Sequence, residues 1–436
     1  VNSMMALWPP PLSPATPSFS VPSRRFIGWN DSANICLKPL RHWGSRHKNL
    51  PRNPTGKQPG TRIMKTKLAL LVGVFAAALY GAGCASAQDT GYSQNSNKEI
   101  EYRRSWVHRY AVEDPRGAGY TMDKVAEALY AKVTTLNLDV GRPAKGRISD
   151  LTPVSEFVNL EELYLYNNAI TNVAPLTKLK KLKKLGLSNN YDLRDIGPLA
   201  NLHSLKEFSF SKTLISDLRP LSGLKSLESL GFQVTRVKDL TPLASLSNLE
   251  RLSMGYNQFE DISALAGMLK LTYLHIADTR VKDLTPLKGL KNLTFLYMSG
   301  NSRITDITPI AEVGSLETLY IWGMPNLKDY TPISKLAKLK TLRMQGNPKL
   351  NDLTFLSELH QLSGLELQGC SIKDITPLAE MKGLTGINLS DNQIKDVMPL
   401  AKIKSLKSIS LQGNPISKED IERLREALPK CKISFK

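Results

Sequence analysis

Cysteine and histidine are scarce in this sequence, with four cysteines and six histidines among 436 residues. No Cys-x-x-Cys pair occurs, and the histidines do not recur at a spacing typical of metal ligands. The glycine-rich phosphate loop, the dinucleotide-binding fingerprint and the Gly-x-Ser-x-Gly motif are also missing. We therefore expect no metal site and no cofactor, and we predict that the protein is not an enzyme.

The four cysteines do not suggest a disulfide framework. Cys36 and Cys84 lie in the N-terminal part of the chain, whereas Cys370 and Cys431 lie in its C-terminal part. Cys370 belongs to a repeated segment described below, and Cys431 lies two repeats further on. Stacked repeats are about 4.8 Å apart, so a bond between these two would need Cα atoms closer than the stacking allows. We expect Cys370 to be a buried small residue.

The apolar run from Leu68 to Tyr80 is shorter than the roughly 20 residues that a membrane-spanning helix needs. It follows Met64–Lys67, which carries two lysines, and small residues come after it. This order is typical of a signal peptide, which we assign to residues 64–87. Export signals act from an N-terminus, so we expect Met64 to be the true start and residues 1–63 to be an untranslated or disordered leader.

Two cleavage sites follow the apolar run. Gly81–Cys84 resembles a lipoprotein signal box, in which Cys84 is lipidated, and Ala85–Ala87 fits ordinary signal peptidase. We favour lipidation, which predicts an exported protein anchored to the outer membrane or cell surface; the alternative is a periplasmic or secreted protein. Residues 88–120 contain a Gln-, Asn- and Ser-rich stretch and are interpreted as tether and linker.

The net charge of +19 is distributed unevenly. Residues 1–63 contain nine Lys and Arg against Asp31 alone, whereas the later repeats interleave Lys with Asp. The predicted strands carry no basic stripe, so we interpret the charge as a solvated surface and expect no nucleic-acid partner. We expect membrane contact only through a lipid on Cys84.

A self-similar unit dominates the rest of the chain. Leucines open its successive copies at steps of 22 or 23 residues, at positions 160, 182, 205, 227, 249, 271, 293, 316, 339, 362, 384 and 406. Such a period is the signature of a solenoid, in which neighbouring repeats bury each other's apolar face. We assign residues 149–414 to the repeats.

Each part of the unit has its own structural meaning. Leu-x-x-Leu-x-Leu predicts a half-buried strand, with Leu274 and Ile276 inward and Tyr273, His275 and Ala277 outward in one repeat. The polar position that follows is Asn in seven repeats, and we expect these side chains to hydrogen-bond the backbone of adjacent repeats. Thr-Pro, as at 285–286, predicts a short helix with Thr as N-cap and Pro at the first helical position.

One aspartate recurs at the same place in ten of the twelve repeats, as at Asp239, Asp283 and Asp374. A ladder of carboxylates can bind calcium. The alternative, which we favour, is that each aspartate caps backbone N–H groups where the return segment begins.

These residues resemble the leucine-rich-repeat family, and specifically the bacterial 22-residue class of the internalins; the match is nearly complete at 384–403. The resemblance implies an α/β solenoid: a horseshoe with a parallel β-sheet on its concave face, short helical or 3-10 return segments and a macromolecular ligand. Similar repeats occur in intracellular regulators that dock on phosphatases, so a regulatory subunit is an alternative.

Both ends of the solenoid have candidate caps. Residues 121–148 combine a short amphipathic helix with a degenerate first strand at 133–138. Residues 415–436 predict a helix, with Ser417 as N-cap and Ile416 packed against Ile421, followed by a last strand.

Aromatic side chains gather at the outward strand positions of three consecutive repeats. The predicted ligand-binding residues are Tyr273, His275, Phe295, Tyr297, Tyr320 and Trp322, with Arg251 and Arg343 beside them, and a secondary patch contains Tyr164 and Tyr166. Interfaces are enriched in Tyr, Trp and Arg, so we expect a protein ligand. Two alternatives remain: the rings bind a glycan, or they only stack across strands to stabilise the sheet.

Overall fold

The computed structural model describes residues 132–140 and 147–435. The predicted leader, signal peptide, tether, N-terminal cap helix and lipidation residue Cys84 lie outside these residues. They therefore stay predictions.

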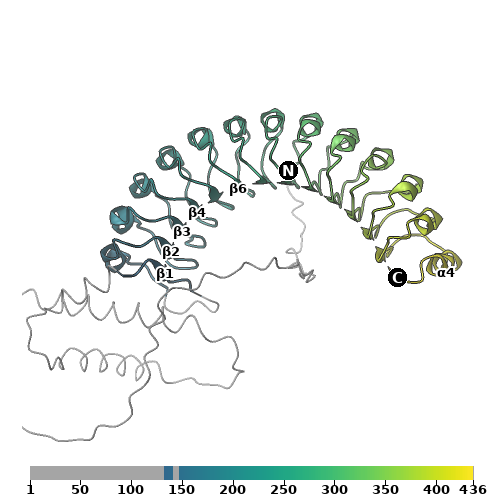
Figure 1. Cartoon of the computed structure of the whole chain (residues 1–436), viewed down its shortest axis with the longest axis horizontal. Helices are drawn as coiled ribbons and strands as arrows, with labels where there is room; N and C mark the ends of the chain where they lie inside the picture. Colours follow the sequence, from purple (N-terminus) through teal and green to yellow (C-terminus); the bar gives the residue numbers. More distant parts are fainter. Residues whose placement is uncertain (1–131, 141–146, 436) are drawn as a thin grey trace, which may run out of the picture. The chain divides into compact units, whose positions relative to one another are not determined.

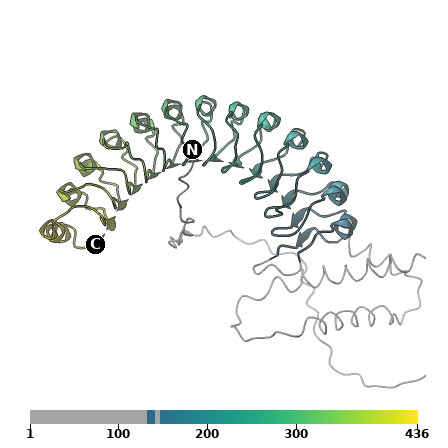
Figure 2. The same cartoon turned by 180° about the vertical axis from the view of Figure 1, so that it is seen from behind.

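The described part of the chain forms one parallel sheet of 14 strands, in which neighbours in sequence are neighbours in space (Figure 1). Each strand is three residues long, and the repeats stack as an open arc with the strands on its concave side (Figures 1 and 2). The strands are β1 Thr135–Asn137, β2 Glu162–Tyr164, β3 Lys184–Gly186, β4 Glu207–Ser209, β5 Ser229–Gly231, β6 Arg251–Ser253, β7 Tyr273–His275, β8 Phe295–Tyr297, β9 Thr318–Tyr320, β10 Thr341–Arg343, β11 Gly364–Glu366, β12 Gly386–Asn388, β13 Ser408–Ser410 and β14 Lys432–Ser434. The predicted parallel sheet, including the degenerate first strand, is confirmed.

The convex side carries one short 3-10 helix per repeat, as predicted (Figure 1). These helices are η1 Thr152–Glu156, η2 Ala174–Lys178, η3 Gly197–Leu199, η4 Arg219–Leu221, η5 Thr241–Leu243, η6 Ser263–Leu265, η7 Thr285–Leu287, η8 Thr308–Glu312, η9 Thr331–Lys335, η10 Thr354–Leu356, η11 Thr376–Glu380 and η12 Met398–Lys402. The predicted N-cap was wrong. Thr285 is the first residue of η7 and Pro286 is the second. The N-cap residue is Leu284, and no side chain makes a capping hydrogen bond there. The aspartate two residues before Thr285 binds the backbone at the start of the helix instead.

The repeated aspartates bind the backbone, as we favoured. Asp283 Oδ1 accepts the Thr285 N–H at 2.8 Å, and the same bond recurs in nine other repeats at 2.7–2.9 Å. Backbone and side-chain hydrogen bonds from Thr285 lower the pKa of Asp283. No group of three or more potential metal ligands occurs among the residues that the structure describes.

The core runs continuously from Leu136 to Leu428 and consists mainly of the repeated leucines and isoleucines. The asparagine row lies inside it, as predicted. Asn301 Oδ1 accepts the Thr279 N–H at 2.9 Å, and Asn301 Nδ2 donates to the carbonyls of Ile276 and Met298 at 2.9 and 2.8 Å. Each such amide therefore satisfies backbone groups of two adjacent repeats that would otherwise be buried without partners.

The residue before the asparagine row adopts a positive φ in twelve successive turns: Asn167, Asn189, Lys212, Val234, Tyr256, Asp278, Gly300, Gly323, Gly346, Gly369, Asp391 and Gly413. Gly and Asn tolerate this conformation at low cost, whereas a β-branched residue is strained in it. Of these twelve residues, Val234, at φ 54°, has the side chain least compatible with a positive φ.

The C-terminal end is closed by α4, Lys418–Ala427, and by β14. The Asp420 N–H donates to Ser417 Oγ at 3.0 Å, which confirms the predicted N-cap. Ile416 and Ile421 are both buried at this end. Cys370 is buried, Cys431 is partly buried, and both are free.

Candidate functional site

The register of the sheet aligns the predicted site residues in two rows. The middle residue of each strand from β1 to β13 is a buried Leu, Ile or Phe, so the first and third residues lie on the concave face. Tyr273 is paired with Phe295, and His275 with Tyr297. Residues about 22 positions apart in sequence are thereby brought into direct contact.

A continuous run of stacked groups begins in the first-position row and crosses to the third-position row. Tyr273 and Phe295 are nearly parallel, with ring centroids 4.6 Å apart and an angle of 10° between the planes. Phe295 meets Tyr320 of the other row edge-on at 5.2 Å. The Arg251 guanidinium lies 4.4 Å from the Tyr273 centroid, and that of Arg343 lies 4.6 Å from the Tyr320 centroid. An arginine therefore covers each end of the run.

The third-position row is built in the same way. His275 stacks on Tyr297 at 4.3 Å, and Tyr297 meets Tyr320 at 5.5 Å and Trp322 at 6.2 Å. The eight predicted residues thus form one contiguous surface, which we call the aromatic platform: Arg251, Tyr273, His275, Phe295, Tyr297, Tyr320, Trp322 and Arg343. The rings contact one another across strands, an arrangement that the stacking alternative also predicts.

His275 lies on the concave side but is only 5% exposed, and Ala277 is fully buried, so the expectation that both face solvent was wrong. The reason is the size of their neighbours. Tyr297 covers the imidazole, while Gly255 leaves room for it: a Cβ at Gly255 would lie 2.7 Å from His275 Nε2. His275 is therefore the buried member of the platform, and Tyr297 lies over it.

The imidazole is held by polar neighbours on one side only. Gln233 Nε2 lies 3.0 Å and Ser253 Oγ lies 3.2 Å from His275 Nδ1, whereas His275 Nε2 has no hydrogen-bond partner among the described residues. Burial lowers the pKa of His275 to about 4. The ring is therefore neutral at pH 7, and this part of the platform carries no positive charge.

Tyr256 is a member of the site that sequence reasoning missed. It is 43% exposed, and its ring meets His275 edge-on with centroids 5.9 Å apart. Burial of Tyr297, together with a hydrogen bond to Tyr256, raises the pKa of Tyr297. The sequence signal for this residue was a tyrosine in a turn position that otherwise favours Gly or Asn. Together with exposed Val234, Tyr256 extends the apolar surface over the edge of the sheet.

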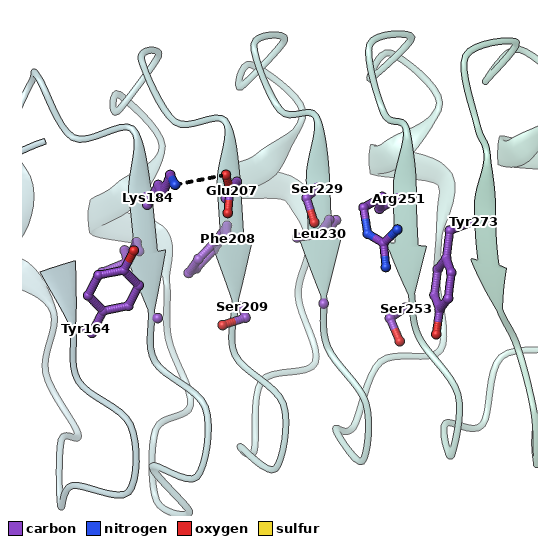
Figure 3. Close-up of a pocket in the computed structure, with 13 residues that line it drawn as sticks. Tyr164, Lys184, Glu207, Phe208, Ser209, Ser229, Leu230, Arg251, Ser253 and Tyr273 are labelled. Atoms are coloured by element: carbon purple, nitrogen blue, oxygen red, sulfur yellow. Dashed lines mark ion pairs between the residues drawn. The ribbon is translucent and has the colours of Figure 1, made fainter. Parts of the chain in front are cut away.

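A shallow hollow of about 340 Å³ adjoins the platform (Figure 3). Tyr164 stands at one end of it, and Arg251 and Tyr273 stand at the other. The hollow exists because Gly186, Ser209 and Gly231 at the third strand position are too small to fill the face.

The secondary patch is smaller and more polar than the platform. Tyr164 Oη donates to Glu162 Oε2 at 3.2 Å, and burial together with Glu162 raises the pKa of Tyr164. Glu162 and Glu207 both pair with Lys184, at 3.4 and 3.3 Å. Figure 3 shows the pair of Lys184 with Glu207. Tyr166 is exposed. This patch is separated from the aromatic platform by the hollow.

No helix among the described residues has the length and apolar character to cross a membrane. The described segments show cation–π pairs, stacked rings and ion pairs on the concave face, which are contacts suited to binding.

Comparisons with known proteins agree with this geometry. Residues 158–201, 225–267 and 270–312 match the family model described as Leucine Rich repeats (2 copies). An internalin of Listeria monocytogenes is 27% identical, with a TM-score of 0.64 over 71% of this chain and 88% of that chain. A leucine-rich-repeat protein of Leptospira interrogans is 22% identical, with a TM-score of 0.62 over 72% of this chain and 86% of that chain.

Proposed function

The chain is a bacterial internalin-like leucine-rich-repeat protein, and from this premise we propose that it is a non-catalytic recognition protein that binds a protein ligand on the aromatic platform. Leucine-rich repeats commonly serve protein–protein recognition, and their stacked repeats create extended concave binding surfaces. The proposal specifies where on this chain the ligand binds.

The observation that carries the proposal is the concentration of Tyr, Phe and Trp over β7, β8 and β9. The same two strand positions in β11 to β13 carry no ring: the first are Gly364, Gly386 and Ser408, the third are Glu366, Asn388 and Ser410, and these strands pair in the same register. The fold therefore does not require rings at these positions. Interface hot spots are enriched in Tyr, Trp and Arg, which is the composition of the platform.

The ring geometry favours a protein over a glycan. A sugar stacks on a free ring face, but Tyr273 has Arg251 on one side and is stacked with Phe295. Tyr297 is likewise stacked on His275, and Arg343 lies over Tyr320. Neighbouring groups therefore cover faces of Tyr273, Tyr297 and Tyr320, which leaves less open ring face for a sugar and favours a polypeptide with mixed apolar and polar groups.

We further propose that the protein is displayed outside the cytoplasm, on the strength of the signal-peptide pattern at residues 64–87. Intact mass and membrane fractionation of the protein from its native gene test this. A lipid-modified chain beginning at Cys84 supports display, whereas an unprocessed cytosolic chain favours a regulatory subunit.

Binding on the platform is tested by selection from a peptide library displayed on phage, with the purified protein as bait. Changing Tyr297, Tyr320 and Trp322 together to Ala should abolish capture of the selected peptides. Tyr191→Ala is the matched control, because Tyr191 is an exposed tyrosine in a turn away from the platform. Peptides that bind the triple variant as well as the original protein would move the site elsewhere.

A further inference from the structure

The two arginines of the platform differ from most charged groups on the concave side. Lys183, Lys206 and Lys340, one residue before their strands, pair with glutamates of adjacent repeats at 2.7–2.9 Å. Arg251 and Arg343 are exposed, and neither forms an ion pair within the described part of the chain; each guanidinium lies over a tyrosine ring instead. Their positive charge is therefore available to a partner.

The strand positions between the arginines carry no opposing charge; carboxylates flank them at Glu366, the register partner of Arg343 in β11, and at Glu250 and Glu317, one residue before β6 and β9. No Asp or Glu occupies a strand position from β6 to β10. The turn residue Asp278 lies against Gly300, and burial raises the pKa of its carboxyl group. An acidic partner would therefore meet an apolar centre with a cation at each end, and complementarity of this kind sets specificity.

Stacking on a tyrosine ring orients each guanidinium group so that it can bind a carboxylate. A guanidinium that lies over an aromatic ring keeps its N–H donors directed outward in its own plane. Those donors match the two oxygens of a carboxylate in a bidentate pair, which is stronger than a neutral hydrogen bond. A lysine at either position would lack this directed fork.

The spacing of the arginines defines the length of the segment. Strands β6 and β10 are four strand steps apart, which corresponds to about 19 Å along the sheet. An extended polypeptide covers about 3.3 Å per residue, so roughly six residues separate two carboxylates placed on the two arginines.

We propose that the platform recognises an extended acidic–aromatic peptide segment that runs across the strands, with one carboxylate on Arg251, one on Arg343 and apolar side chains between them. This inference rests on the proposed function, because it specifies the chemistry of the ligand at the same site. The segment belongs to the partner protein and occupies β6 to β10.

The sequences selected from a randomised peptide library, about twelve residues long to exceed the 19 Å span, test the inference. We expect enrichment of two acidic residues five to seven positions apart with Trp, Tyr, Phe or Leu between them. Arg251→Glu and Arg343→Glu should each lower the affinity of a selected peptide about tenfold, the loss expected for a charge-assisted hydrogen bond. The double reversal should enrich Lys and Arg at the same two positions.

The outcomes separate this inference from the proposed function. Neutral or basic peptides that bind the original protein but not the triple alanine variant would overturn the acidic ligand and keep the platform. Peptides insensitive to both sets of variants would overturn both. Absence of any enriched peptide also counts against the extended-segment ligand. Circular dichroism of each variant confirms folding, since both arginines are exposed and their removal opens no cavity.

Discussion

The imidazole of His275 lies flat against the phenol ring of Tyr297, with centroids 4.3 Å apart and an angle of 2° between the planes. This pair joins the buried layer of the concave face to its exposed layer. Because Tyr297 is stacked on the buried ring of His275, its orientation is set before any ligand arrives. Pre-ordered aromatic side chains lose little conformational entropy on binding.

The His275–Tyr297 pair makes the stability of the protein depend on pH. Burial holds the pKa of folded His275 at about 4, below its ordinary value of 6.5, so the unfolded chain takes up the proton first. The contribution of neutral His275 to stability is therefore complete above pH 6.5 and declines as the pH falls towards 4. Thermal melting across this range should show a shallower decline for His275→Gln; parallel curves for the two proteins would contradict the assignment.

Two glycine-to-alanine substitutions should differ in their effect on the free energy of unfolding. A Cβ at Gly186 meets only ordinary contacts, the nearest 3.6 Å away on Tyr164, so Gly186→Ala should leave stability unchanged or raise it by up to about 1 kcal/mol. A Cβ at Gly255 would lie 2.7 Å from His275 Nε2 and 2.9 Å from the Ala277 carbonyl, so Gly255→Ala should cost about 1–3 kcal/mol. Urea denaturation measures both. Equal effects would show that His275 does not occupy this space.

Leu296→Ala removes a fully buried side chain from the strand beneath the platform. The cavity should lower the free energy of unfolding by about 2–5 kcal/mol, since stacked repeats cannot collapse to fill it. Chemical denaturation checks this value, with Thr294→Ala on the exposed edge as control. An unchanged midpoint for Leu296→Ala would refute the inward assignment.

Asn301→Ala deletes an amide that binds backbone groups of two adjacent repeats. Each buried group left without a partner costs about 1–3 kcal/mol, so the loss should exceed that of an ordinary surface change. Asn292→Ala is the matched control, because Asn292 makes one exposed bond to the Leu269 carbonyl. Equal melting temperatures for the two variants would contradict the role of the asparagine row.

Val234→Gly relieves a β-branched residue held at a φ of 54°. The strain of about 1–2 kcal/mol is partly offset by the greater entropy of glycine in the unfolded chain, so we expect a melting temperature that is equal or slightly higher. The same change at Val237, which is fully buried with ordinary backbone geometry, should strongly destabilise the protein. A lower melting temperature for Val234→Gly would show that its exposed side chain stabilises the fold.

The sequence alone determined the repeats, the direction in which each leucine points, the asparagine row, the capping aspartates and the helix that begins after Ser417. These features depend on spacing within one repeat or on a rule that every repeat obeys, so local periodicity is sufficient to find them. The threonine N-cap failed because the N–H groups that a cap at Thr285 would bind, those of Leu287 and Lys288, already donate to the carbonyls of Leu284 and Thr285.

The tertiary structure decided how the side chains of different repeats share the concave face. His275 is buried because Gly255 on one side is small and Tyr297 on the other is large, and these residues are some 20 positions away in the chain. The hollow beside Tyr164, the inclusion of Tyr256 and the covering of ring faces by Arg251 and Arg343 arise in the same way. Alternation along a strand tells which face a side chain joins, but its exposure there depends on neighbours that only the stacking of repeats brings into contact.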